Sequence, residues 1–117
     1  MSDRYIKDGK VAVLVSYGYG SGWSTWNWDH PNIIFDPFIV ECVLEHNQLE
    51  GDAKIDHLDV LVPRVEEYGK KAYPGAYLGG VWGLDVTWVP VGEKFRIHEY
   101  DGSERVILES EHKWIVA

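Results

Sequence analysis

The feature that most constrains this chain is the run KVAVLVSY at residues 10–17, which is almost entirely β-branched and aliphatic and lies between Gly9 and Gly18. The run does not alternate between apolar and polar residues, so it does not fit a strand with one face in water. It is typical of a strand that is buried on both faces. We therefore expect a strand over 10–17 that other parts of the chain cover on both sides.

The middle of the chain predicts helices. Asp36 and Pro37 are an N-cap acceptor and a proline at the first helical position, and they predict a helix over 37–48. One face of this helix carries Phe38, Ile39, Cys42, Val43 and His46. Residues 55–75 predict either two short helices or one kinked helix, because Pro63 interrupts them, with an end at Gly69 or Pro74.

From Gly83 onward the pattern alternates with a period of two, which predicts strands. The first covers 84–90, and the dipeptide Asp101-Gly102 predicts a tight hairpin turn between strands 94–100 and 103–109. Residues 112–117 predict a last edge strand. The order of strand, helices and further strands predicts one α+β domain over residues 1–117, with a mainly antiparallel sheet and two or three helices on one face.

Residues 16–28, SYGYGSGWSTWNW, form a first aromatic segment with three glycines, three tryptophans and two tyrosines. Such rings can stack on a flat ligand while hydroxyl and glycine N–H groups meet phosphate or ribose. The glycines alternate strictly and no P-loop lysine follows, so the segment matches neither the dinucleotide-binding nor the P-loop motif. The alternative is that its tryptophans cover the end of the sheet as core residues.

Residues 73–83, YPGAYLGGVWG, form a second aromatic segment. We expect the two segments to meet at one end of the sheet, or across a dimer interface, and to line a pocket; the alternative is a plain helix-to-strand connection. Within the first segment we expect Tyr19 and Trp23 to be functional and Trp26 to be structural. The expected ligand-binding residues are Tyr17, Gly18, Tyr19, Gly20, Ser21, Gly22, Trp23, Ser24, Trp26 and Trp82.

Composition excludes several classes of protein. The chain has 11 Lys and Arg against 19 Asp and Glu, a formal net charge of -8, which disfavours nucleic acid or an anionic membrane as a partner but permits mimicry of DNA. Cys42 is the only cysteine, so no disulfide framework or paired-cysteine zinc motif exists. No window is apolar for long enough to cross a bilayer. We expect a cytoplasmic protein.

No catalytic motif stands out. The histidines are scattered and no G-x-S-x-G elbow occurs, so we expect no metal, no cofactor and no enzymatic activity. Cys42 fits a small buried hydrophobe. Asp56, His57 and Asp59 lie close enough to orient a general base, but acidic residues near a helix start also favour the helix dipole, and that structural interpretation is preferred.

Three stretches, KVAVLVSYGYGSGWSTWN, FDPFIV and WVPVGEKFRIHEYDGSE, resemble segments of a family of small uncharacterised proteins carried by tailed bacteriophages and some bacteria. The likeness spans most of the chain, and the glycine–tryptophan segment is its distinctive part. The resemblance implies a setting without a mechanism. In that setting, small acidic proteins act against host defence by capturing a nucleotide signal or by covering a protein surface.

Two functions follow as expectations. The first is a binding protein that sequesters a small nucleotide-like immune signal between the two aromatic segments. Few basic residues are nearby, so the positive charge would come from elsewhere in the fold or from a second subunit: Arg4, Lys7, Lys70, Lys71 or Arg96. The alternative is an inhibitor that binds a host defence protein directly through an aromatic or acidic surface. The sequence leaves the oligomeric state open.

Overall fold

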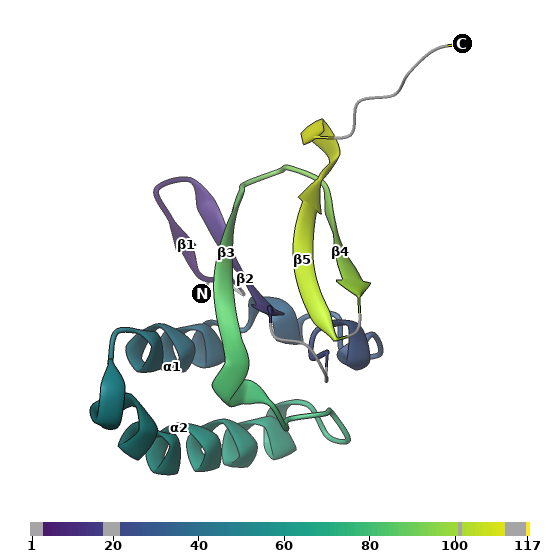
Figure 1. Ribbon diagram of the computed structural model, residues 1–117. Helices are drawn as coiled ribbons and strands as arrows, with labels where there is room; N and C mark the ends of the chain where they lie inside the picture. The colour runs from purple at the N-terminus through teal and green to yellow at the C-terminus, as the bar shows by residue number, and fades with distance from the viewer. Residues whose placement is uncertain (1–3, 18–21, 101, 112–116) are drawn as a thin grey trace.

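Strand β2 (Lys10–Ser16) lies at the centre of the computed structural model, which describes residues 4–17, 22–100, 102–111 and 117. It pairs with β1 (Ile6–Lys7) on one side and with β3 (Leu84–Pro90) on the other, both antiparallel (Figure 1). Every β2 residue after Lys10 is buried. The strand predicted over 10–17 is confirmed, with both of its faces covered.

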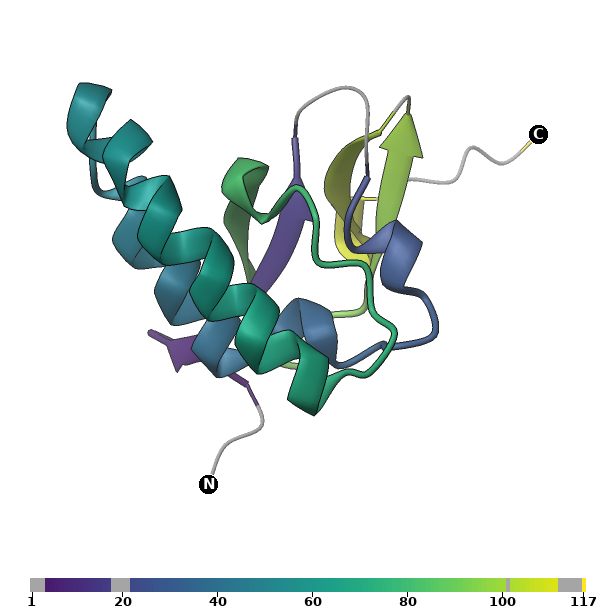
Figure 2. The same ribbon diagram turned by 90° about the horizontal axis from the view of Figure 1, so that it is seen from below.

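The two faces of β2 pack against different layers. Ala12 and Leu14 join the core formed with helices α1 (Pro37–Asn47) and α2 (Gly51–Ala72). Val13 and Val15 pack on the opposite side against the hairpin of β4 (Phe95–Tyr100) and β5 (Ser103–Leu108). Figure 2 shows β2 between the helices and this hairpin. An apolar layer on each side explains why the β2 sequence does not alternate.

Helix α1 begins where the sequence predicts. The Asp36 carboxylate accepts hydrogen bonds from the N–H groups of Phe38 (2.9 Å) and Ile39 (3.1 Å), and Pro37 occupies the first helical position. Cys42 is buried on the inner face of the helix, as expected, and burial raises the pKa of its thiol. The capped start at Asp36 is confirmed.

Helix α2 is one helix, and it starts at Gly51, earlier than the sequence pattern indicates. Pro63 lies inside it, where the ring removes the hydrogen bond to the carbonyl of Asp59. Both residues are exposed, so water can satisfy that carbonyl. The helix ends at Ala72, between the two predicted ends. Gly69 is buried there, and a Cβ at this position would lie 2.6 Å from Leu78 Cδ2, so any larger residue would require the Leu78 side chain to move.

The C-terminal hairpin follows the predicted turn. Gly102 has φ 86°, in the left-handed region that favours glycine, while Asp101 and residues 112–116 lie outside the described part of the chain. β4 and β5 form a two-stranded sheet separate from β1–β2–β3, so the strands make two sheets where one was expected. Antiparallel sheets with both long helices on one face of the larger sheet confirm the α+β class.

Candidate functional site

Eight of the ten expected ligand-binding residues fall into three groups, and the other two, Gly22 and Ser24, are described below. Gly18, Tyr19, Gly20 and Ser21 lie outside the described residues. Trp23 is only 1% exposed and belongs to the core, and its indole N–H has no acceptor among the described residues. Three others are exposed at the surface: Tyr17, Trp26 (48%) and Trp82 (63%). Trp23, expected to be functional, is thus a core residue, and Trp26, expected to be structural, lies partly exposed at the surface.

The glycine at position 22 has a packing reason. A Cβ at Gly22 would lie 2.9 Å from Thr25 Oγ1 and 3.0 Å from Trp26 Nε1, closer than side chains normally approach. A side chain at position 22 would therefore require Thr25 or Trp26 to move.

The hydrogen-bond donors of the first aromatic segment bind a carboxylate of the protein itself. Glu104, on β5, is fully buried and accepts six hydrogen bonds, which we call the Glu104 network. The donors are the backbone N–H groups of Ser16 (3.0 Å), Trp23 (3.0 Å), Ser24 (3.1 Å) and Thr25 (2.7 Å), and the hydroxyls of Ser24 (2.8 Å) and Thr25 (2.6 Å).

Burial alone raises the pKa of the Glu104 carboxyl, but the hydrogen bonds from Thr25, Ser16 and Ser24 outweigh burial and hold this pKa below its ordinary value of 4.5. The carboxylate is thus charged at neutral pH. Glu104 was not among the expected site residues, although a signal exists. It lies two positions before the inward-facing Val106 and therefore on the same face of β5, so its charge falls on the buried side of the strand.

The two aromatic segments meet, as expected. The side-chain amide of buried Asn27 donates to the Tyr77 carbonyl (2.9 Å) and accepts from the Tyr77 N–H (2.7 Å), which mimics a strand pairing. The rings of Trp26 and Tyr77 lie with their centroids 5.0 Å apart. These contacts fix the second segment against the first and leave one face of the Trp26–Tyr77 pair at the surface.

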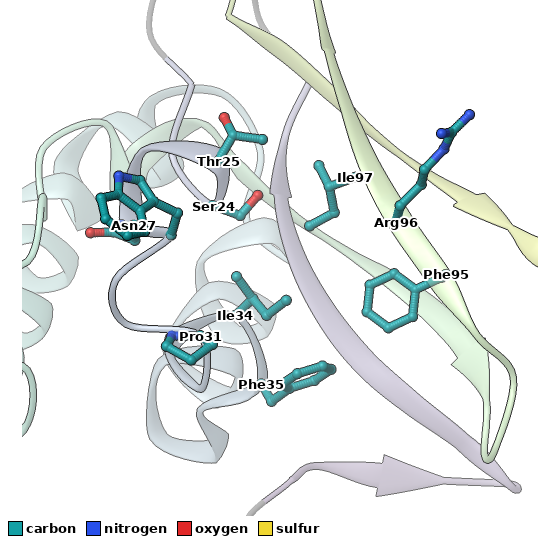
Figure 3. Close-up of a pocket in the computed structure, with 10 residues that line it drawn as sticks. Ser24, Thr25, Asn27, Pro31, Ile34, Phe35, Phe95, Arg96 and Ile97 are labelled. Atoms are coloured by element: carbon teal, nitrogen blue, oxygen red, sulfur yellow. The ribbon is translucent and has the colours of Figure 1, made fainter.

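An open groove of about 430 Å³ lies between residues 24–35 and β4. Trp28, 81% exposed, lines this groove together with Phe35 and Phe95. The rings of Phe35 and Phe95 meet edge to face with centroids 6.0 Å apart. Strand alternation turns Phe95 and Ile97 toward the groove, whereas the Arg96 side chain points away from it (Figure 3). We call this the aromatic groove. Neither Trp28 nor Phe95 was among the expected site residues.

His57, considered above as a general base oriented by Asp56 and Asp59, makes its contacts with residues of α1. His57 Nδ1 lies 3.0 Å from Nδ1 of His46 on α1, and its Nε2 lies 3.8 Å from Glu45. Asp56 and Asp59 are exposed on α2 and make no contact with His57. Because α2 starts at Gly51, Asp56 and Asp59 lie beyond its first turn, and the expectation that they favour the dipole of a helix start is wrong. His57 instead joins α2 to α1.

The geometry of the described residues limits the chemistry. Among them, no group of three or more His, Cys, Asp or Glu side chains is placed to hold a metal ion. No helix in the same part of the chain is long and apolar enough to cross a membrane. Comparisons with protein-family models, with curated proteins and with solved structures found no match. The aromatic groove is therefore the feature from which a function can be argued.

Proposed function

We propose that this chain is a non-catalytic binding protein whose aromatic groove receives an apolar or aromatic side chain from a partner protein with a basic surface. The observation that carries this proposal is the 81% exposure of Trp28 beside a groove lined by Phe35, Phe95 and Ile97. A tryptophan held this far out of the core contributes little to folding, but it is the residue type that most often anchors protein interfaces.

The chemistry of the groove favours a protein partner over a nucleotide. The N–H and hydroxyl groups of Ser24 and Thr25, which would meet a phosphate, are bonded to the Glu104 carboxylate. A multiply charged ligand also wants Arg or Lys, and Arg96 points out of the groove (Figure 3). The remaining lining is largely ring and aliphatic surface, which suits an apolar side chain.

The net charge of the protein supports the second part of the proposal, which is that the partner has a basic surface. With a formal net charge of -8, the protein attracts a basic surface over a distance of about one Debye length, while the aromatic groove supplies the contact. The phage setting implied by the sequence resemblance makes a host defence protein the partner class we propose.

The test is selection of short random peptides against the purified chain, followed by calorimetric affinities. We expect the selected peptides to combine basic residues with an aromatic or large aliphatic one, and to bind less tightly as salt rises. Trp28→Ala should weaken them about 30-fold, since an anchor tryptophan contributes about 2 kcal/mol or more. Trp82→Ala is the matched control, because Trp82 is also exposed but does not line the groove.

Three outcomes count against the proposal. The first is a selection that enriches no peptide. The second is a set of peptides whose affinity falls equally in Trp28→Ala and Trp82→Ala, because binding would then not depend on the groove. The third is displacement of the peptides from the groove by mononucleotides at micromolar concentration, which would restore the nucleotide-capture function instead.

A further inference from the structure

Two lysines face each other across the first hairpin. Asp8 (φ 53°) and Gly9 (φ 75°) form its two-residue turn, and Lys7 pairs directly with Lys10 in the strand register. Like charges directly opposite on one face of a sheet destabilise the pair. The register thus places two exposed lysine side chains next to each other on one face of the sheet.

The rest of the fold does not explain this pair. Neither lysine makes an ion pair or hydrogen bond with another side chain in the described ranges. Lysine on an edge strand prevents pairing with other chains, which accounts for Lys7 on β1. Lys10 is on β2, the middle strand of its sheet, so this explanation does not extend to Lys10.

An indole lies on the same face as the lysines. Ala12 pairs with Trp88 of β3, and strand alternation places Lys7, Lys10 and Trp88 on one side of the sheet. These three side chains and Asp8 line a hollow of about 380 Å³, and Lys7 and Trp88 also border a second one of about 310 Å³ against α1.

The hollow and the aromatic groove lie on opposite faces of the larger sheet. Trp88 packs on the side of Ala12 and Leu14, whereas Phe35, Phe95 and Ile97 of the groove pack on the side of Val13 and Val15. The hollow also lies at the other end of β2 from the Glu104 network (Figure 1). On the α1 side, the second hollow is bordered by Glu41 and Glu45, whose carboxylates repel an anion. The favourable place for negative charge is therefore between the two lysines.

We propose that Trp88, Lys7 and Lys10 form a binding site for a small flat anion, of which a nucleoside monophosphate is the representative. The ring stacks on Trp88, and the anionic group lies between the two ammonium groups, where it removes their mutual repulsion. Asp8 borders the same hollow and weakens the site by its charge. This site is independent of the proposed function, because it shares no residue with the aromatic groove.

The test is calorimetric titration with AMP, adenosine and inorganic phosphate. AMP should bind about tenfold or more tightly than adenosine or phosphate, since only AMP makes both stacking and charged contacts. The double variant Lys7→Gln/Lys10→Gln should lose about tenfold in AMP affinity or more. The double variant Lys70→Gln/Lys71→Gln, at the end of α2, removes the same charge away from the hollow and should bind as the unaltered protein does.

Asp8→Asn gives a test with the opposite sign. Asn-Gly keeps the two-residue turn, and loss of the carboxylate should tighten AMP binding about two- to fivefold. The proposal is overturned if AMP shows no binding at millimolar concentration, if adenosine or phosphate alone equals AMP, or if both lysine double variants weaken AMP equally. It is equally overturned if Asp8→Asn weakens AMP binding while circular dichroism shows an unchanged fold.

Discussion

Glu104 is the residue on which the end of the sheet depends. Its carboxylate joins β5 to the end of β2 through Ser16 and to residues 23–25 through five backbone and side-chain donors. Hydrogen bonds to a charged acceptor contribute about 1.5–3 kcal/mol each at most, and the buried donors become costly when the acceptor is removed. The hydrogen bonds that hold residues 23–25 against β5 therefore depend on one side chain about 80 residues later in the sequence.

We predict that Glu104→Gln lowers the free energy of unfolding at neutral pH by about 3–5 kcal/mol, because an amide nitrogen cannot accept the hydrogen bonds of one carboxylate oxygen. The folded-state pKa of Glu104 is lowered, so its contribution is present above pH 4.5 and is lost as the pH falls toward the folded-state value. Denaturant titrations should show the two proteins converging in acid. A constant difference down to the lowest pH would contradict the charged carboxylate.

Asp36 combines a predicted role with an unpredicted one. One carboxylate oxygen caps α1, and the other accepts from the hydroxyls of Tyr68 (2.6 Å) and Tyr73 (2.5 Å) at the end of α2. Burial and these hydrogen bonds raise the pKa of Tyr68 to about 12, and they raise that of Tyr73 further. Both hydroxyls stay protonated and act as donors.

Asp36→Ala should therefore lower the free energy of unfolding by about 3 kcal/mol. This is more than the roughly 0.5–2 kcal/mol lost with a cap alone, because two partly buried tyrosine hydroxyls also lose their acceptor. Tyr73→Phe removes one of these bonds and leaves the cap, and it should cost about 1 kcal/mol. Thermal or denaturant unfolding of the variants measures both. Equal stability of Asp36→Ala and Tyr73→Phe would show that the cap contributes nothing.

These two carboxylates also show what a sequence can reveal at this scale. The Asp36 cap depends on neighbours two and three residues away, so local pattern predicts it. The partners of Glu104 lie about 80 residues away and include backbone N–H groups, which have no residue-type signal. Only the inward position of a charge on β5 could have drawn attention to it.

At the scale of elements, a histidine pair joins α1 to α2. His46 is buried, and its ring stacks on that of His57 with an interplanar angle of 24°. With the two Nδ1 atoms 3.0 Å apart, one must donate and the other accept, so the contact fails when both rings are protonated. Burial, then the neighbouring His57 and Lys54, lowers the pKa of His46 below 6.5.

Stability should consequently fall as the pH drops below 6.5. The unfolded chain takes up a proton at His46 where the folded protein does not, so the stability from neutral His46 is present above pH 6.5 and is lost toward the folded-state pKa. Unfolding midpoints of His46→Gln should depend less on pH across this window. His98→Gln, on an exposed position of β4, is the control and should follow the unaltered protein. An unchanged slope in His46→Gln would contradict this account.

Element boundaries were predictable to different degrees. Local sequence patterns predict the strands at 10–17, 84–90, 94–100 and 103–109 and the helix at 37–48. All of them appear, with ends shifted by one residue at most. Helix α2 was harder because Pro63 suggested a break, whereas its exposure lets the helix continue. The division of the strands into two sheets depends on tertiary packing across Val13 and Val15, which periodicity does not encode.

At the scale of the whole molecule, each end of β2 carries a different surface. Its C-terminal end carries the Glu104 network and the contact between the aromatic segments, and its N-terminal end carries the lysine pair. The meeting of the aromatic segments was predictable, because both flank strands that pair. Which tryptophan is core was not, since Trp23 and Trp26 have similar local sequence and differ only in what packs over them.

Alanine substitutions test whether Trp28 belongs to a binding surface and Trp23 to the core. Trp23→Ala should cost about 3–5 kcal/mol in unfolding free energy, as for a large buried side chain. Trp28→Ala should stay within about 1 kcal/mol of the unaltered protein, because its side chain is mostly in water.

The decisive measurement is the affinity of Trp28→Ala for a library-selected peptide, taken on protein whose unfolding free energy has been determined. We expect Trp28→Ala to bind the peptide about 30-fold more weakly at a nearly unchanged free energy of unfolding. Full affinity in Trp28→Ala would contradict the assignment of the aromatic groove as the binding site, and a loss of stability comparable to that of Trp23→Ala would show that Trp28 is a packing residue.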